Sequence, residues 1–278
     1  DYRAVDPAVG TWSDVEAVCE NFTLMFDIVL NHISQQSDWF QKFRQGDPQY
    51  LDFFIEVTPE MDLSSVVRPR SLPLFHEFET SAGPKKIWTT FSRDQVDLNY
   101  GNPQVLCAML EVLLHYVEHG ARIIRLDAVA FLWKTPGTTC LHLKQTHQII
   151  KFYRDVLSIV APHVILLTET NVSHKENISY FGDGDEAHMV YQFSLPSLLA
   201  DALIQEDVRP LRRWLLSVDA PLSGTTFFNF TASHDGIGIS PLKGLVHQER
   251  IEALITATEK SGGRISFRRA PDGNDVPY

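Results

Sequence analysis

Apolar residues along this chain form two kinds of segment, short runs rich in β-branched residues and longer stretches with helical spacing. Because apolar residues fill the short runs without alternating, these runs predict buried parallel strands. The predicted strands are residues 24–32, 120–129, 164–171, 188–193 and 225–230. Helices are predicted, from apolar residues three and four apart and from capping residues, at 11–22, 102–119, 141–160 and near 247–260, with helical segments over roughly 195–219.

Polar residues follow the predicted strands, with Asp127, Glu169 and Asp235 at the carboxyl ends of three of them. This arrangement is typical of the (β/α)8 barrel, whose active site lies in the loops after the strands. A doubly wound open sheet also binds ligands there, but no Gly-x-Gly-x-x-Gly sequence follows any strand. We therefore predict an α/β barrel. Because five strands are visible, the chain corresponds to a section of a barrel that lacks the first strands and the last.

Residues 33–98 interrupt this rhythm with many Asp, Pro, Arg and aromatic residues and with little periodicity. A segment of this length without regular elements is usually functional or is a small inserted subdomain. It contains Arg68 and Arg70 on either side of a proline. Two arginines held in this way could bind a phosphate or a carboxylate, and they could equally belong to a solvated loop. The tail 261–278 is rich in Gly, Arg and Pro and is predicted to be a loop.

Composition restricts the class of protein further. The chain has 278 residues, is 44% hydrophobic and carries a net charge of −11, which argues against nucleic-acid and anionic-membrane partners. Its apolar runs are much shorter than the ~20 residues of a membrane span. Cys19, Cys107 and Cys140 are widely spaced, which is neither a disulfide framework nor a zinc pattern. With no signal peptide at the polar start of the sequence, these features predict a cytoplasmic protein with reduced cysteines.

Arg125 and Asp127 stand out because they lie in an apolar run. Residues two apart on a strand share a face and are about 7 Å apart, so the guanidinium can hold the carboxylate ionised. An isolated carboxylate in apolar surroundings would otherwise cost several kcal/mol. The pair alone is equally consistent with a structural ion pair at a strand end.

Three acids at the tips of three strands are harder to explain by structure alone. Transfer of a sugar requires two carboxyl groups facing one glycosidic bond, one to attack the anomeric carbon and one to protonate the leaving oxygen. A third carboxylate can raise the pKa of the acid or hold sugar hydroxyls. We therefore interpret Asp127, Glu169 and Asp235 as a candidate catalytic set.

Four ordered motifs resemble those of the α-amylase superfamily, glycoside hydrolase family 13. They are residues 27–32 (DIVLNH), residues 125–128 (RLDA), Glu169 after its apolar strand, and residues 234–235 (HD). The resemblance implies a barrel, formed here by residues 1–32 and 99–278, with an inserted B domain at roughly 33–98. Such a chain would begin after the first two barrel strands and stop before the eighth. We therefore expect this 278-residue piece to be poorly stable or inactive by itself.

The resemblance also implies roles for individual residues. Asp127 would be the nucleophile that forms a glucosyl ester, Glu169 the general acid/base, and Asp235 the stabiliser of the transition state. Arg125 would orient Asp127, and the donor glucose would bind at two histidines, His32 and His234. Asn31 is a calcium ligand in many amylases, but no supporting acidic cluster accompanies it, and Asp183 and Asp185 have the pattern of an ordinary turn, so no metal is predicted.

Within the superfamily, the chain is most similar to the sucrose phosphorylase-like branch. The motifs are residues 88–92 (WTTFS), 95–97 (QVD), 180–182 (YFG), 190–196 (VYQFSLP) and 234–238 (HDGIG). Residues 68–70 (RPR) with 137–140 (GTTC) look most like enzymes that act on glucosylglycerate or sucrose 6′-phosphate. By this analogy Phe91 and Phe131 would stack on sugar, Gln95 would hydrogen-bond in the cleft, and Arg68 or Arg70 would meet phosphate or an anionic acceptor.

The resulting functional prediction is retaining transfer of a glucosyl group to inorganic phosphate, which yields α-glucose 1-phosphate. The carboxylates perform the acid–base work, so phosphate is a co-substrate and no cofactor is predicted. Two alternatives stay open. One is an α-glucoside hydrolase that uses the same residues, and the other is an inactive amylase-like fragment or binding protein. The partners are expected to be a small sugar and phosphate, with the acceptor moiety and the oligomeric state left open.

Overall fold

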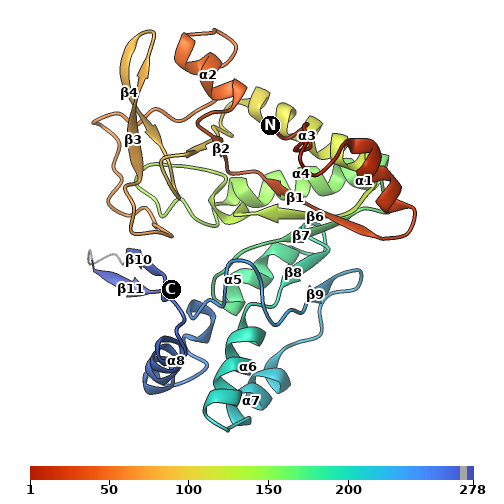
Figure 1. Ribbon diagram of the computed structural model, residues 1–278, viewed down its shortest axis with the longest axis vertical. Helices are drawn as coiled ribbons and strands as arrows, with labels where there is room; N and C mark the ends of the chain where they lie inside the picture. The colour runs from red at the N-terminus through yellow and green to blue at the C-terminus, as the bar shows by residue number, and fades with distance from the viewer. Residues whose placement is uncertain (270–273) are drawn as a thin grey trace. The chain divides into compact units, whose positions relative to one another are not determined.

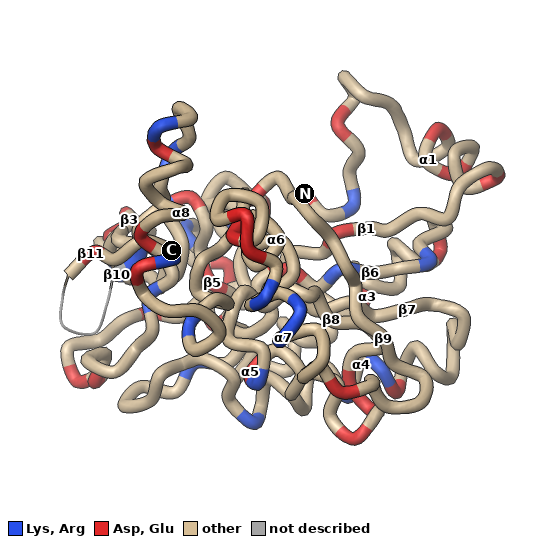
Figure 2. Tube along the Cα trace, turned by 90° about the horizontal axis from the view of Figure 1, so that it is seen from below, with Lys and Arg blue, Asp and Glu red and all other residues tan. Residues whose placement is uncertain are grey.

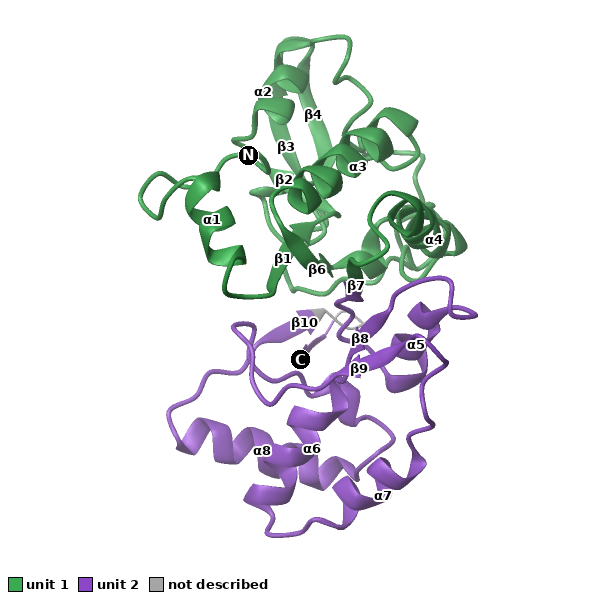
Figure 3. Ribbon diagram, turned by 90° about the vertical axis from the view of Figure 1, so that its right-hand side faces the viewer, with its two compact units in different colours: residues 1–166 green, residues 167–278 purple. Residues whose placement is uncertain are grey.

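A computed structural model describes residues 1–269 and 274–278, which fold into two compact units, residues 1–166 and 167–278 (Figures 1 and 3). Each unit has parallel strands connected through helices. Within the described residues, five strands are paired in parallel. β1 and β6 belong to the first unit, and β8 and β9 belong to the second. β7 pairs with β8 and begins two residues before the boundary between the units. All five coincide with strands predicted from apolar runs.

The first unit is built on the parallel pair β1 and β6. Asp27 on β1 lies beside Arg125 on β6, and Val29 lies beside Asp127. Helix α1 begins with a capping box between Thr11 and Asp14, and α3 begins after the N-cap Asn102 and packs against β6. The elements are α1 (Trp12–Cys19), β1 (Leu24–Val29), α3 (Pro103–Glu118), β6 (Ala121–Asp127), the 3-10 turn η1 (Val129–Phe131) and α4 (Lys144–Val160).

The segment 33–98 contains more regular structure than its sequence predicts. It holds β2 (His32–Ser34), α2 (Asp38–Gln45), β3 (Phe75–Thr80), β4 (Gly83–Trp88) and β5 (Gln95–Asp97). β2 pairs with β5 and β3 pairs with β4, both in antiparallel fashion. The predicted strand 24–32 therefore consists of two strands. The chain leaves the parallel pair after Val29, and His32 then pairs with Asp97 across a different ladder.

The second unit has three short parallel strands and a helical core. Leu198, Trp214, Leu242 and Leu254 are buried together where α6, α7 and α8 meet. The prediction of an irregular tail is wrong in part, because β10 and β11 form an antiparallel pair. The elements are β7 (Ile165–Thr168), α5 (His174–Ile178), η2 (Ser179–Phe181), β8 (Met189–Tyr191), α6 (Ser194–Ile204), α7 (Arg209–Ser217), β9 (Thr226–Phe228), η3 (Ser240–Leu242), α8 (Gln248–Lys260), β10 (Phe267–Arg269) and β11 (Asp275–Pro277).

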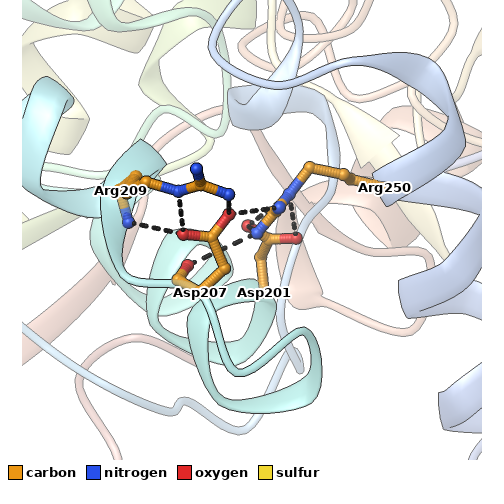
Figure 4. A network of polar contacts seen from close by, with 4 residues as sticks. All are labelled: Asp201, Asp207, Arg209 and Arg250. Atoms are coloured by element: carbon orange, nitrogen blue, oxygen red, sulfur yellow. Dashed lines mark hydrogen bonds and ion pairs between the residues drawn. The ribbon is translucent and has the colours of Figure 1, made fainter.

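A network of ion pairs connects the helices of the second unit (Figure 4). Arg250 on α8 contacts the buried carboxylate of Asp201 on α6 at 2.7 Å and the carboxylate of Asp207 at 2.9 Å. Arg209 also binds Asp207, at 2.7 Å. Hydrogen bonds from Arg209 and from Arg250 hold the pKa of Asp207 well below its usual range. Because Asp201 is 1% exposed, its charge requires this guanidinium.

Charged residues are spread along the backbone trace, with acidic and basic positions interspersed (Figure 2). Within the residues that the structure covers, no helix combines the length and the apolar character that crossing a bilayer would need. Cys19, Cys107 and Cys140 are all free thiols. Asp183 and Asp185 form a turn, in which the Asp183 amide donates to the Asp185 carboxylate at 3.1 Å, as their spacing predicts.

Candidate active site

The carboxyl end of β6 carries an ion triplet. Nη1 of Arg125 lies 2.6 Å from Oδ1 of Asp127 and 2.8 Å from Oδ2 of Asp27. The arginine side chain is 5% exposed, and Asp127 and Asp27 are 25% and 46% exposed. The strand register therefore places Arg125 and Asp127 on one face, as predicted. The ion pair between Asp27 and Arg125 was not predicted, although a carboxylate inside an apolar strand was a signal that could have found it.

The backbone turns sharply after Asp127. Ala128 has φ 50° and ψ 28°, in the left-handed region that residues with a Cβ rarely adopt, and η1 follows directly. Strained residues of this kind cluster at functional sites. The turn ends β6 at the candidate nucleophile and carries Phe131 in η1.

Four predicted sugar-binding residues lie together in the first unit. Nε2 of His32 is 2.8 Å from the amide nitrogen of Gln95, and the His32 ring is 5.2 Å from the ring of Phe91. Phe91 in turn meets Phe131 edge-on at 5.3 Å. His32 is 6% exposed, and burial lowers its pKa against the opposing influence of Asp97 and Asp127. A neutral imidazole beside two aromatic rings and an amide is suited to hydroxyl groups and to the apolar face of a sugar.

A buried polar network lies beside His32 and was not predicted. Asp97 is completely buried, and its carboxylate accepts bonds from Nδ2 of Asn31 at 2.9 Å and from the backbone amide and hydroxyl of Thr90 at 2.7 and 2.6 Å. The ammonium of Lys134, 3% exposed, lies 2.7 Å from this carboxylate and 2.6 Å from Oδ1 of Asn31. Burial lowers the pKa of Lys134, and Asp97 opposes that effect. The network joins three segments that are far apart in the sequence.

This network bears on the calcium ion that many amylases hold at the position of Asn31. Calcium takes six to eight oxygen ligands. Here the Lys134 ammonium occupies Oδ1 of Asn31, the oxygen that a metal would need. The residues present do not fit a calcium ion. Within residues 1–269 and 274–278, no group of three or more His, Cys, Asp or Glu side chains is placed to hold a metal.

Arg68 and Arg70 lie in a partly exposed loop of the first unit. The Arg68 guanidinium donates to the carbonyl of Leu72. The loop is joined to the segment after β6, because the amide of Val67 donates to Thr139 O at 3.0 Å and the amide of Gly137 donates to Asp62 O at 2.7 Å. The two sequences that pointed to an anionic acceptor, 68–70 and 137–140, are therefore neighbours in the structure.

In the second unit, Glu169 follows β7 and is partly buried. The next residue, Thr170, is 3% exposed and donates to Oδ1 of Asn177 at 2.7 Å. Nδ2 of Asn177 donates to the carbonyl of Tyr191 at the end of β8, at 2.6 Å. Since Thr170 and Asn177 are both buried, these bonds fix the backbone from which Glu169 projects.

Asp235 and His234 lie after β9 in an exposed loop. Their side chains are 56% and 74% exposed, and Nε2 of His234 is 3.2 Å from Oδ2 of Asp235. A few residues further, a Cβ on Gly238 would lie 2.5 Å from Nδ2 of Asn171, so the loops after β9 and β7 touch. The second unit thus brings the Asp235 and Glu169 loops to one end of its strands, whereas Asp127 belongs to the first unit.

Comparisons with known proteins agree with these features. Residues 1–239 match the family described as "Alpha amylase, catalytic domain". The chain is 56% identical over 278 residues to the glucosylglycerate phosphorylase of Spirochaeta thermophila and 50% identical over 280 residues to that of Escherichia coli, in each case across the whole of this chain. These matches cover 47% and 50% of the relatives, so the chain spans about half of their length.

A solved structure is also similar. The sucrose 6F-phosphate phosphorylase from Thermoanaerobacter thermosaccharolyticum matches with a TM-score of 0.86 at 25% identity, over 99% of this chain and 58% of that one. The parallel strands and their helices therefore form part of a (β/α) barrel, as the sequence predicted, and the suspected branch is confirmed. The chain belongs to the α-amylase family.

Proposed function

We propose that this chain supplies a large part of the catalytic domain of a glucosylglycerate phosphorylase. The reaction would transfer a glucosyl group from glucosylglycerate to inorganic phosphate, giving α-glucose 1-phosphate and glycerate. The observation that carries the proposal is the buried Arg125, whose guanidinium lies 2.6 Å from the Asp127 carboxylate at the end of β6. The identity of 50–56% to glucosylglycerate phosphorylases, against 28% to a sucrose phosphorylase, favours glucosylglycerate as the donor.

In the first step, an oxygen of the Asp127 carboxylate attacks the anomeric carbon as the glycosidic bond breaks. Glu169 donates its proton to the departing glycerate oxygen, so the products are a glucosyl ester on Asp127, free glycerate and an ionised Glu169. Arg125 orients the Asp127 carboxylate, since its guanidinium is a permanent hydrogen-bond donor. Asp235 binds the sugar hydroxyls and stabilises the positive charge that develops on the ring.

In the second step, a phosphate oxygen attacks the anomeric carbon from the face that glycerate left. The ester bond to Asp127 breaks, Glu169 takes the proton of the attacking phosphate, and α-glucose 1-phosphate forms with the original configuration. Two inversions give net retention. No cofactor is required, because every proton and bond is handled by the carboxylates and by phosphate.

The donor glucose would lie against the group made of His32, Gln95, Phe91 and Phe131, with His234 as a further contact. The proximity of His32, Gln95, Phe91 and Phe131 in the first unit supports the assignment of these four residues. Arg68 and Arg70 would bind the phosphate or the glycerate carboxylate, since a planar guanidinium matches both anions. The backbone bonds that join their loop to residues 137–139 support a common anion-binding region.

The test is release of glucose 1-phosphate by the protein as its gene encodes it. Glucosylglycerate, sucrose 6′-phosphate and sucrose are offered with and without phosphate, beside an Asp127→Asn control. We expect phosphate-dependent turnover of glucosylglycerate, and a loss of at least about 1,000-fold in Asp127→Asn. Free glucose at a rate indifferent to phosphate would make the protein a hydrolase. Absence of turnover of every donor would favour a binding protein.

A further inference from the structure

Lys134 is a buried cation that the proposed reaction does not use. Its Nζ has two acceptors, Oδ1 of Asn31 and Oδ2 of Asp97, at 2.6 and 2.7 Å. The lysine and Asp97 side chains are 3% and 0% exposed, so neither charge reaches solvent. Removing two charges from water is costly unless their geometry and hydrogen bonds are good. Both conditions are met here, because Asp97 also accepts three further bonds, from Asn31 and Thr90.

Lys134 and its two acceptors come from three separate segments of the chain. Asn31 lies between β1 and β2, Asp97 ends β5, and Lys134 follows η1 after β6. These are the points at which the chain enters and leaves segment 33–98 and at which it leaves β6. The amide of Leu98 also donates to the carbonyl of Asn31, at 3.0 Å. The lysine therefore sits at the junction of the inserted segment with the barrel strands.

We propose that Lys134 is a built-in cation that takes the place of a bound metal at this junction and positions His32 through Asn31. Asn31 is the residue before His32, and its amide nitrogen lies 3.3 Å from Nδ1 of the imidazole. With Asn31 held by the ammonium on one side and by Asp97 on the other, the His32 ring keeps its place beside Gln95. Lys134 is thus a positioning residue, and the first unit needs no divalent ion at this point.

The number of oxygen atoms left to bind a cation favours a lysine over a metal. A divalent cation would need the side-chain oxygens of Asn31 and Asp97 together with further oxygens. The Asn31 oxygen already accepts from Lys134, and the Asp97 oxygens accept the four bonds described above. A single ammonium supplies the positive charge that Asp97 needs while it preserves every one of these hydrogen bonds.

The first experiment measures metal dependence in the unaltered protein as its gene encodes it. We expect the thermal midpoint to be unchanged by dialysis against EDTA and by addition of millimolar CaCl₂ or MgCl₂. Elemental analysis is expected to find no stoichiometric divalent metal after purification. A midpoint that falls on chelation and returns with calcium would overturn the proposal, whatever the behaviour of any variant.

The second experiment separates charge from packing. Lys134→Met keeps the length of the side chain and leaves the Asp97 carboxylate without its counter-charge, which should lower the thermal midpoint by about 10 °C. Lys134→Met with Asp97→Asn removes both charges and should recover at least half of that loss. Lys144→Met, on an exposed position of α4, is the matched control and should shift the midpoint by about 1 °C or less. Equal midpoints for Lys134→Met and the control would refute the role of the ammonium.

The third experiment removes the Lys134 side chain and supplies an ammonium group from solution. Lys134→Ala should gain thermal stability, and recover glucosylglycerate turnover, when propylammonium is added, but not when 1-propanol of the same size is added. Lys144→Ala should respond to neither compound. Rescue of stability without any change in the KM for glucosylglycerate would confine Lys134 to a structural role and contradict its positioning of His32. If the proposed reaction itself fails, the chelation and midpoint measurements still decide the proposal.

Discussion

Asp127 and Asp235 both follow a strand, but their surroundings differ in almost every respect. Asp127 meets a 5% exposed arginine at 2.6 Å and lies in the unit that also holds the buried network of Asp97. Asp235 is 56% exposed and is paired with an exposed histidine at 3.2 Å. Its turn is held by a 3.3 Å bond from its own amide to Oγ of Ser233.

The carboxylates of Asp127 and Asp235 are therefore held in place in two different ways. Around Asp127, the buried Arg125 both orients the acid and neutralises two neighbouring carboxylates, so loss of this cation would affect activity and the fold together. Around Asp235, exposed contacts contribute little to stability, because solvent screens them and the side chains keep their freedom. Substitutions near Asp127 should therefore damage folding and activity together, and substitutions at Asp235 should damage activity alone.

The largest effect is expected from Arg125→Met. It leaves Asp27 and Asp127 close together without the cation that joins them, and should lower the free energy of unfolding by about 3 kcal/mol. Urea unfolding followed by circular dichroism measures the change, and glucose 1-phosphate release should fall with it. Arg122→Met, at an exposed position of the same strand, is the control and should change stability by less than about 0.5 kcal/mol. Similar results for the two variants would remove the basis of the comparison.

A moderate effect is expected from Thr170→Val, at the residue next to Glu169. Thr170→Val keeps the shape of the side chain but removes the donor to Asn177, which leaves a buried amide oxygen without this bond. The free energy of unfolding should fall by about 1–2 kcal/mol, with a loss of activity because Glu169 adjoins the altered backbone. Thr226→Val, exposed on β9, is the matched control. A stable variant with full activity would show that the bond to Asn177 does not place Glu169.

A smaller effect is expected from pH. Burial lowers the pKa of His32 below its ordinary value of 6.5, so the unfolded chain binds a proton more readily than the folded one. Stability due to this residue is therefore complete above pH 6.5 and declines as the pH falls below it. Unfolding curves between pH 7.5 and 5.5 should show a shallower decline in His32→Gln than in the parent, with His234→Gln as the exposed control. An unchanged slope in His32→Gln would contradict the proton linkage.

The smallest effect on stability is expected from Asp235→Asn. Because the side chain is more than half exposed, the free energy of unfolding should change by less than about 0.5 kcal/mol. Phosphorolysis should nevertheless fall by at least about 100-fold, since the carboxylate would no longer stabilise the transition state. Asp183→Asn, in the turn before β8, should leave both quantities unchanged. A loss of stability in Asp235→Asn comparable to that in Arg125→Met would remove the distinction between the two regions.

Local patterns in the sequence were sufficient for the five parallel strands, for the longer helices between them and for the polar residues at the ends of those strands. Helix α3 begins at Pro103 and ends at Glu118, close to the predicted 102–119, because a capping asparagine precedes it and a glycine follows its C-cap. The pairing of Arg125 with Asp127 followed from the two-residue period of a strand. These features depend on neighbours in the chain and can therefore be inferred from the order of residues.

Features that depend on distant partners were missed. The sequence does not tell Lys134 from an ordinary surface lysine until the fold brings it to Asp97, and Asp27 acquires its role only when β1 pairs with β6. The antiparallel pairs β2–β5 and β10–β11 were missed for the same reason, because three-residue strands carry too few positions for a period to be visible.

The most direct test of the account is identification of the residue that carries the glucosyl group. The protein as its gene encodes it is incubated with 5-fluoro-α-D-glucosyl fluoride, digested at low pH and analysed by peptide mass spectrometry. We predict one fluoroglucosyl ester, on Asp127, which disappears when phosphate is added and is absent from the Asp127→Asn variant. An ester on another carboxylate, or turnover of glucosylglycerate with inversion of configuration, would contradict it.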